Sequence, residues 1–255
     1  HGKIVFIGED GQVDNQQTNM IWDFSITKNV FSLLFSIFIL LSVFVTISRR
    51  YKNQKNQPPK GIQSLLEPII IFVRDDIAKS AIGEKHHEKY LSFLLTVFFF
   101  IFLNNLLGLV PFFPGGANLT GNIAVPMVLA SLVFIITTLS GTKYYWKHIF
   151  AMPGVPKPVL LILTPIEILG VLLKPLVLMI RLFANITAGH IIILSFFSMI
   201  FIFGEMHPAA GYGVSVFSGL FVLFMMTLEL LVAFLQAYVF TLLAAMYFGA
   251  ALEEH

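Results

Sequence analysis

Two unusually long apolar stretches dominate the second half of this sequence. The first covers residues 160–203 (44 residues) and the second covers residues 214–248 (35 residues). As continuous α-helices they would be roughly 66 and 52 Å long, whereas the hydrocarbon core of a bilayer is about 30 Å thick. Each stretch must therefore divide into two membrane spans or cross the membrane at a strong tilt. Pro165 and Pro175 offer breaks in the first stretch, but no polar loop accompanies them, so we favour tilt.

The composition agrees with a chain that lies largely in lipid. Hydrophobic residues make up 57% and charged residues 12% of the 255 residues, and the mean hydropathy is +0.85. Soluble domains carry about 25% charged residues, so a cytosolic enzyme, a nucleic-acid-binding protein and a disordered chain are excluded. The absence of cysteine excludes disulfides, thiolate metal sites and a cysteine nucleophile. No nucleotide loop, metal motif or catalytic triad order is present, so we expect no cofactor, no metal and no catalytic site.

The first half of the sequence supplies shorter apolar segments, each long enough for one membrane span. They are residues 30–47, 91–111 and 123–140. Residues 62–81 instead mix apolar and charged side chains at helical spacing, which is typical of an amphipathic helix on the membrane surface; a solvated linker helix is the alternative. The sequence therefore predicts an all-α polytopic membrane protein with five membrane-crossing helices, the last two long, tilted and paired as a hairpin. Residues 1–29 form a polar N-terminal segment, and residues 30–255 form the membrane domain.

The distribution of cations orients the chain in the membrane. Residues 49–60 contain five Lys or Arg side chains and no acid, and residues 141–158 contain three lysines. Segments 112–122 and 204–213 contain neither Lys nor Arg. Because Lys and Arg are enriched in cytoplasmic loops, five crossings place the N-terminus outside and the C-terminus in the cytoplasm. Dividing only one of the two long stretches would reverse the orientation of everything after it.

Ionisable residues inside membrane spans are costly and are functional-site candidates by default. In this chain they cluster in the two long stretches. Glu167, Lys174 and Arg181 are seven residues apart, and each step of seven drifts only about 20° around a helix, so they share one face. The same face continues to Ser195, and Asn185 joins it because it lies four residues after Arg181.

An antiparallel hairpin about the turn 204–213 brings a second polar set alongside the first. Its midpoint lies near position 209, so His190 comes beside Glu229 and Arg181 comes level with Gln236. Glu229 and Gln236 are also seven residues apart and face the same way. His190 lies about half a turn away from the Arg181 face, so we expect it to point towards the neighbouring helix.

These residue types suit an ion path that is interrupted by a fixed positive charge. Arginine stays protonated in any protein environment, whereas a buried lysine can lose its charge, so a permanent barrier requires Arg181. Glu167 lies two heptads away and Glu229 lies beside His190, so we expect a carboxylate on another subunit to face the arginine. His190 and Glu229 have the chemistry of a proton relay, because imidazole titrates near neutral pH.

Each of these residues also has a structural alternative. Arg181 could be a cross-brace between helices, and His190 could be an interhelical hydrogen-bonding residue. Lys174 could extend its ammonium group to the membrane surface. Asn104 and Asn105 could link neighbouring helices by hydrogen bonds.

Four runs of residues resemble the subunit a family of F-type ATP synthases. They are LKPLVLMIRLFANITAGH (173–190), ELLVAFLQAYVF (229–240), NLLGLVP (105–111) and TPIE (164–167). The resemblance covers roughly residues 28–255, and the arginine run together with the second run is highly specific. It implies a stator subunit in the bacterial plasma or inner membrane that lies beside a rotating c-ring and a peripheral-stalk subunit b.

The resemblance also implies roles for single residues. Arg181 matches the arginine that faces the carboxylates of the ring and separates two aqueous half-channels. The half-channel from the outside is implied to contain Asn185, His190, Glu229 and Gln236. Glu167 matches a position on the cytoplasmic exit, and protons are the default coupling ion. The main alternative is a secondary transporter with midplane charges, which predicts inverted repeats that we do not find in the sequence.

Overall fold

The computed structural model describes residues 27–53, 61–110, 119–150 and 155–253. Within these ranges the chain is helical apart from short connections, and it contains no strand. Most of the predicted N-terminal segment 1–29 and of the predicted turn 112–122 lies outside the described residues.

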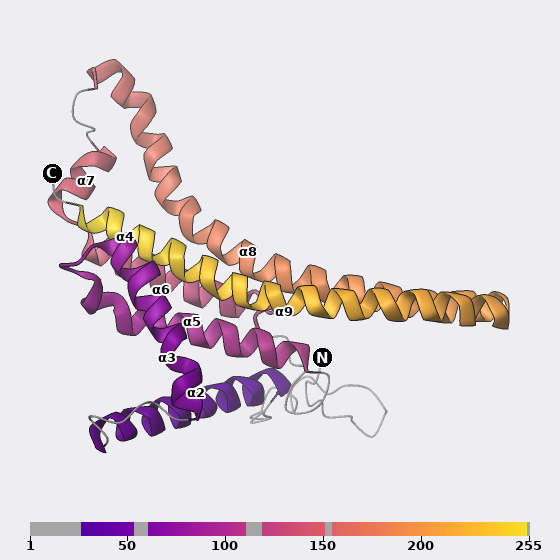
Figure 1. Cartoon of the computed structure of the whole chain (residues 1–255). Coiled ribbons are helices and arrows are strands. Elements are labelled where there is room, and N and C mark those ends of the chain that lie inside the picture. The colour runs from indigo at the N-terminus through magenta and orange to yellow at the C-terminus, as the bar shows by residue number, and fades with distance from the viewer. Residues whose placement is uncertain (1–26, 54–60, 111–118, 151–154, 254–255) are drawn as a thin grey trace, which may run out of the picture.

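The two long apolar stretches form the two longest helices. They are α8 (Lys157–Met206, 50 residues) and α9 (Pro208–Leu252, 45 residues), and they pair as an antiparallel hairpin (Figure 1). Both helices are continuous, because Pro165 and Pro175 lie inside α8 without ending it. The first part of α8 turns away from α9 in Figure 1, and the rest lies alongside it. The alternative of two separate spans within each stretch is therefore not supported.

The tip of the hairpin is much tighter than the predicted turn 204–213, which is wrong in extent because only His207 separates the two helices. The imidazole Nδ1 of His207 accepts a hydrogen bond from the Ala209 N–H at 3.2 Å. Two glycines then allow the backbones to touch: a methyl group added at Gly211 would lie 2.7 Å from the Cα of Gly204. The sequence pattern showed small residues here, but they serve close helix packing and not a loop.

The main core lies between α5 (His87–Leu109) and α9. Phe98 of α5 and Phe248 of α9 are completely buried, and Tyr90 stacks on Phe248 with ring centroids 5.0 Å apart. α2 (Lys28–Asn53) packs against α5, where Phe44 meets a phenylalanine ring edge-on. Aromatic packing thus fixes α9, so α5 and α9 form a rigid support for the residues that face α8.

The predicted amphipathic helix 62–81 is helical but consists of three consecutive segments. They are α3 (Ile62–Phe72), the π-helical η1 (Val73–Lys79) and α4 (Ser80–Ile82). Val73, Ile77 and Ala78 are completely buried, and η1 packs against both α5 and α9. Arg74 lies on the opposite, exposed side and pairs with Asp75 at 2.8 Å. This burial does not fit the alternative of a solvated linker helix.

The predicted loop 141–158 is partly helical. α6 (Ala124–Ser140) ends before Gly141, and α7 (Lys143–Phe150) follows after a bend of 103°. The Thr142 hydroxyl accepts a hydrogen bond from the Tyr145 N–H at 3.2 Å, which caps the start of α7. Two of the three lysines that indicated a loop, Lys143 and Lys147, lie on this short helix, and Lys157 begins α8.

Among the described helices, four are long and apolar enough to cross a membrane, and the bent pair α6–α7 would make a fifth. The prediction of an all-α polytopic membrane protein is confirmed. The chain is an integral membrane protein whose two longest helices carry the candidate site.

Candidate functional site

Arg181 lies on an exposed, apolar face of α8. Arg181 is exposed, and Val177 and Ile180 beside it are 44% and 46% exposed, although Leu178 and Leu182 on the neighbouring face of α8 are buried. Arg181 forms no ion pair with any described residue. Its charge does act on Tyr247 of α9, which lies within electrostatic range. A permanent cation therefore stands on a lipid-like surface that the rest of the described chain leaves uncovered.

One turn further along α8, a hydrogen bond joins the two long helices. The Asn185 amide Nδ2 donates to the Gln236 Oε1 at 2.8 Å. Gln236 is 3% exposed, and its own amide Nε2 has no hydrogen-bond partner among the described residues. The sequence predicted Gln236 level with Arg181; in the structure the Gln236 amide bonds to Asn185, which lies one helical turn after Arg181 on α8.

His190 and Glu229 line one small cavity, with Asn105 and Asn185 in the same wall. The cavity measures about 20 Å³, which is room for about one water molecule. The histidine lies within electrostatic range of the carboxylate, but the pair forms no direct salt bridge. The Glu229 Oε1 is buried without a hydrogen-bond partner in the described part of the chain. A water in this cavity would connect the two groups and satisfy that oxygen.

Gly189 makes room for the Glu229 carboxylate. The side of Gly189 that would carry a Cβ faces the Glu229 carboxylate, which occupies that space. A side chain at position 189 would therefore displace the acid. Sequence reasoning gave Gly189 no role, because a glycine inside an apolar helix is also common at ordinary helix contacts in membranes.

Thr120 is a second residue that the sequence reasoning missed. Its hydroxyl donates to the Asn105 Oδ1 at 2.8 Å, and the Asn105 Nδ2 donates to the Ala233 carbonyl of α9 at 3.4 Å. Thr120 and Asn105 are 1% and 3% exposed. This chain of bonds fixes the orientation of the Asn105 amide at the wall of the cavity. Only three-dimensional contact reveals it, because Thr120 precedes α6 and belongs to no periodic pattern.

The other predicted residues lie apart from this cluster. The Lys174 ammonium group lies over the Tyr247 ring, 5.6 Å from its centroid. Glu167 lies within electrostatic range of Tyr145 on α7. The Ser195 hydroxyl donates to the Ile191 carbonyl of its own helix, so it joins no other predicted residue. The predicted residues that share a face by their spacing all lie on the single helix α8, but they contact different neighbours.

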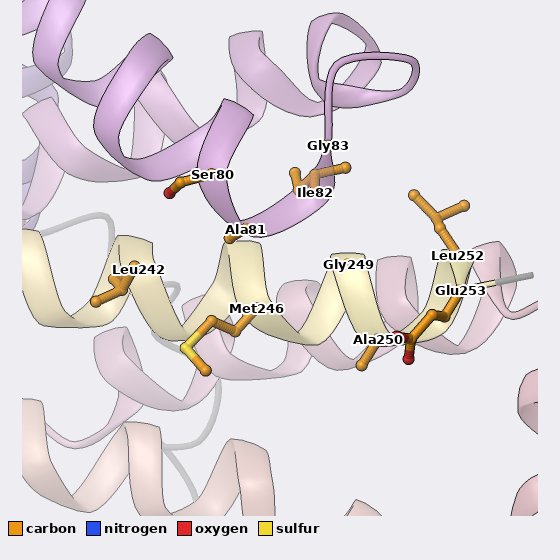
Figure 2. Close-up of a pocket in the computed structure, with 10 residues that line it drawn as sticks. All are labelled: Ser80, Ala81, Ile82, Gly83, Leu242, Met246, Gly249, Ala250, Leu252 and Glu253. Carbon is orange, nitrogen blue, oxygen red and sulfur yellow. The ribbon is translucent and has the colours of Figure 1, made fainter.

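A larger cavity lies elsewhere in the described part of the chain. It measures about 670 Å³ and lies where the end of α4 crosses α9 near its C-terminus, and Figure 2 shows Ala81 directly over the α9 ribbon. None of the predicted site residues lines it. In the described part of the chain, no three His, Cys, Asp or Glu side chains group to hold a metal ion.

Comparison with known proteins shows the family of the chain. Residues 30–249 match the family model described as ATP synthase A chain. The chain is 41% identical over 240 residues to ATP synthase subunit a of Chloroherpeton thalassium, covering 92% of this chain and 69% of that protein. It is 44% identical over 243 residues to ATP synthase subunit a of Chlorobium phaeobacteroides, covering 92% of this chain and 68% of that protein. It is 40% identical over 232 residues to ATP synthase subunit a of Myxococcus xanthus, covering 89% of this chain and 73% of that protein. The all-helical fold, the long hairpin and these matches together place the chain in the ATP synthase subunit a family.

Proposed function

We propose that this chain is the proton-translocating stator subunit of a rotary ATP synthase. In this proposal it forms two offset aqueous half-channels against a ring of carboxylate-bearing subunits, and Arg181 is the charge barrier between them. The observation that carries the proposal is the exposure of Arg181 on an apolar helix face without an acid of its own chain. Such a charge is costly in lipid unless a carboxylate of another subunit faces it.

The cluster around Glu229 is the entry side of the proposed path. A proton reaches His190 and Glu229, which share a cavity with room for about one water molecule. From there it neutralises a carboxylate of the ring. The neutral carboxyl group can then face lipid, which the ionised group does only at high cost. The bond between Asn185 and Gln236 holds the two helices together between this cavity and Arg181.

The exit side of the proposed path lies near Glu167. When a protonated ring site arrives there, it releases its proton to the cytoplasmic side. Arg181 then keeps the carboxylate ionised as it passes and blocks direct leakage between the half-channels. Each charge that crosses 100 mV supplies about 2.3 kcal/mol, so several protons are needed for each ATP.

The surroundings follow from the same proposal. The N-terminus lies outside and the C-terminus in the cytoplasm of a bacterial plasma or inner membrane, as the cation distribution indicates. The ring covers the Arg181 face of α8, and a peripheral-stalk subunit b holds the chain against rotation. The subunit has no catalytic site of its own in this scheme.

The test is proton pumping by the assembled complex in sealed vesicles, followed with a pH-sensitive dye. In Arg181→Ala we expect ATP-driven pumping to be lost, because no fixed charge then keeps the ring carboxylate ionised or blocks leakage between the half-channels. Arg74→Ala is the matched control, because Arg74 is an exposed cation on η1 that pairs only locally with Asp75. Unchanged pumping in Arg181→Ala would refute the proposal, and solute binding by the chain alone would favour a secondary transporter.

A further inference from the structure

A pocket of about 370 Å³ lies between the second half of α2 and the start of α3. Val43 and Ile47 of α2 supply an apolar wall, and Arg50 stands one turn beyond Ile47. Ile62 and Gln63 of α3 close the other side. The pocket thus combines an apolar wall with a cationic end, and it is separate from the cluster around Glu229.

The α3 side of the pocket is a helix N-terminus of an 11-residue helix. The residue before it is Gly61, which has no side chain to cap the helix, and the first turn contains no acid. The Ser64 N–H of this turn bonds to the Gly61 carbonyl at 3.1 Å, which leaves the N–H groups of Ile62 and Gln63 without a carbonyl partner in their own helix. The helix dipole adds partial positive charge there. This end of α3 is therefore suited to an anion.

Gln63 gives an independent indication of a ligand. Its side chain lines the pocket and is 8% exposed, yet it makes no hydrogen bond with any described residue. Its amide nitrogen and oxygen are not among the fully buried unpartnered atoms of the described chain, so they remain open to the pocket that the side chain lines. Its Nε2 is a donor that suits an acceptor oxygen.

The position in the chain indicates what kind of anion fits. The apolar run 30–47 ends at this pocket, and residues 49–60, which follow it, hold five cations and no acid. This is the depth at which an apolar span meets lipid headgroups. Basic pockets at the cytoplasmic ends of spans suit anionic headgroups. A free anion would have no use for the apolar wall formed by Val43 and Ile47.

We propose that this pocket binds the phosphate of an anionic phospholipid. Arg50 and the Gln63 side-chain amide hold the phosphate oxygens together with the backbone N–H groups of Ile62 and Gln63, and the acyl chain lies along Val43 and Ile47. α2 packs against α5 and makes very little direct contact with α3. The lipid therefore links α2 to the surface segment α3–η1–α4, which packs on α5 and α9.

The test uses the full chain in nanodiscs that contain equal amounts of phosphatidylglycerol and phosphatidylcholine. Native mass spectrometry then counts the lipids that stay bound after release. We expect the wild-type chain to retain one phosphatidylglycerol in preference to phosphatidylcholine. Gln63→Glu, which places a carboxylate in the anion site, and Arg50→Gln are each expected to lower this retention about fivefold or more.

Arg49→Gln is the matched control, since it removes the same charge from the neighbouring residue, which does not line the pocket. It should retain phosphatidylglycerol as the wild type does. Gln63→Met keeps the length of the side chain without its donor, so it tests the site if Gln63→Glu fails to fold. The proposal is overturned if Gln63→Met retains wild-type lipid, if Arg49→Gln matches Arg50→Gln, or if phosphatidylcholine is retained equally. It is also overturned if excess inorganic phosphate releases the bound lipid, because the site would then take a free anion.

Discussion

At the scale of single residues, the contact between Gly189 and Glu229 is the sharpest constraint in the candidate site. A methyl group at position 189 would overlap the Glu229 carboxylate. We expect Gly189→Ala to push this carboxylate out of the cavity that it shares with His190. Overpacking of this kind destabilises a protein by about 1–3 kcal/mol. The change should lower the thermal stability of the chain and reduce proton pumping by the assembled complex.

The matched control for this prediction is Gly219→Ala in α9. Nothing lies within 4 Å of a Cβ added at Gly219, and alanine is a better helix former than glycine by about 0.8–1.0 kcal/mol. Gly219→Ala should therefore keep or slightly raise stability, with normal pumping. If both alanine variants behave alike, the Glu229 carboxylate does not depend on the space at Gly189.

The sequence could predict the residues that repeat along a helix. The spacing of seven residues predicted that Arg181 shares one helix face with Glu167 and Lys174. The antiparallel hairpin predicted that His190 lies beside Glu229, and in the structure these two residues line the same cavity. Spacing could not predict the contact of Thr120 with Asn105, since it depends on how the chain returns from α5 to α6. The functional roles of these residues stay predictions until they are tested.

At the scale of elements, Thr120 connects the segment before α6 to α5 and, through Asn105, to α9. We expect Thr120→Val, which keeps the shape but removes the hydroxyl, to leave the buried Asn105 Oδ1 without a donor. An unsatisfied buried group of this kind costs about 1–3 kcal/mol. The thermal stability of the assembled complex should fall, and proton pumping should fall with it because the Asn105 amide loses its fixed orientation. Thr120→Ser, which restores the hydroxyl, should recover both.

Thr137→Val is the control for this network. Thr137 is also buried, but its hydroxyl donates only to the Val133 carbonyl of its own helix, at 2.7 Å. Loss of this bond breaks no contact between two helices, so proton pumping should stay normal. Equal loss of pumping in Thr120→Val and Thr137→Val would show that the network does not position Asn105.

The hairpin tip offers a second test at this scale. A methyl group at Gly211 would lie 2.7 Å from the Cα of Gly204, whereas a methyl group at Gly204 would lie 4.0 Å from the Cα of Gly211. We therefore expect Gly211→Ala to force the helices apart and to lower the free energy of unfolding by about 1–3 kcal/mol. Gly204→Ala should be tolerated, since 4.0 Å is an ordinary contact. Thermal unfolding of the two variants in the same lipid would measure the difference.

Element boundaries show where the sequence argument reached its limit. The length of the apolar stretches predicted two long helices, and α8 and α9 are continuous as favoured. The segment 204–213 looked like a turn because glycine and proline usually mark loops. In the structure these residues extend the helices, and packing between glycines takes precedence over local propensity. The same limit applies to α7, whose start depends on a cap by Thr142.

At the scale of the whole molecule, the uncovered face of α8 predicts where the ring binds. The chain contains no cysteine, so single cysteines can be introduced without background. Ile180→Cys, beside Arg181, should crosslink to a cysteine placed near the carboxylate of the ring subunit. Leu139→Cys on α6 is the control, because Leu139 is 81% exposed but lies on a different helix. Crosslinking to the ring at Leu139 and not at Ile180 would contradict the proposed orientation of α8.

The fold class of the whole molecule was the part best determined by sequence. Composition and apolar length indicated an all-α polytopic membrane protein, and the helices of the described residues bear this out. The packing of the surface segment α3–η1–α4 could not be predicted, because a mixed apolar and charged pattern does not show which helices the segment contacts. Burial of Val73 and Ile77 against α5 and α9 settles that point.

Arg181 forms no ion pair with any described residue, and this has a consequence for biogenesis. In the proposed arrangement, a newly inserted copy of this chain exposes Arg181 to hydrocarbon until a carboxylate of another subunit faces it, at a cost of several kcal/mol. We expect the orphan chain to be short-lived, so the same side chain serves as an assembly checkpoint.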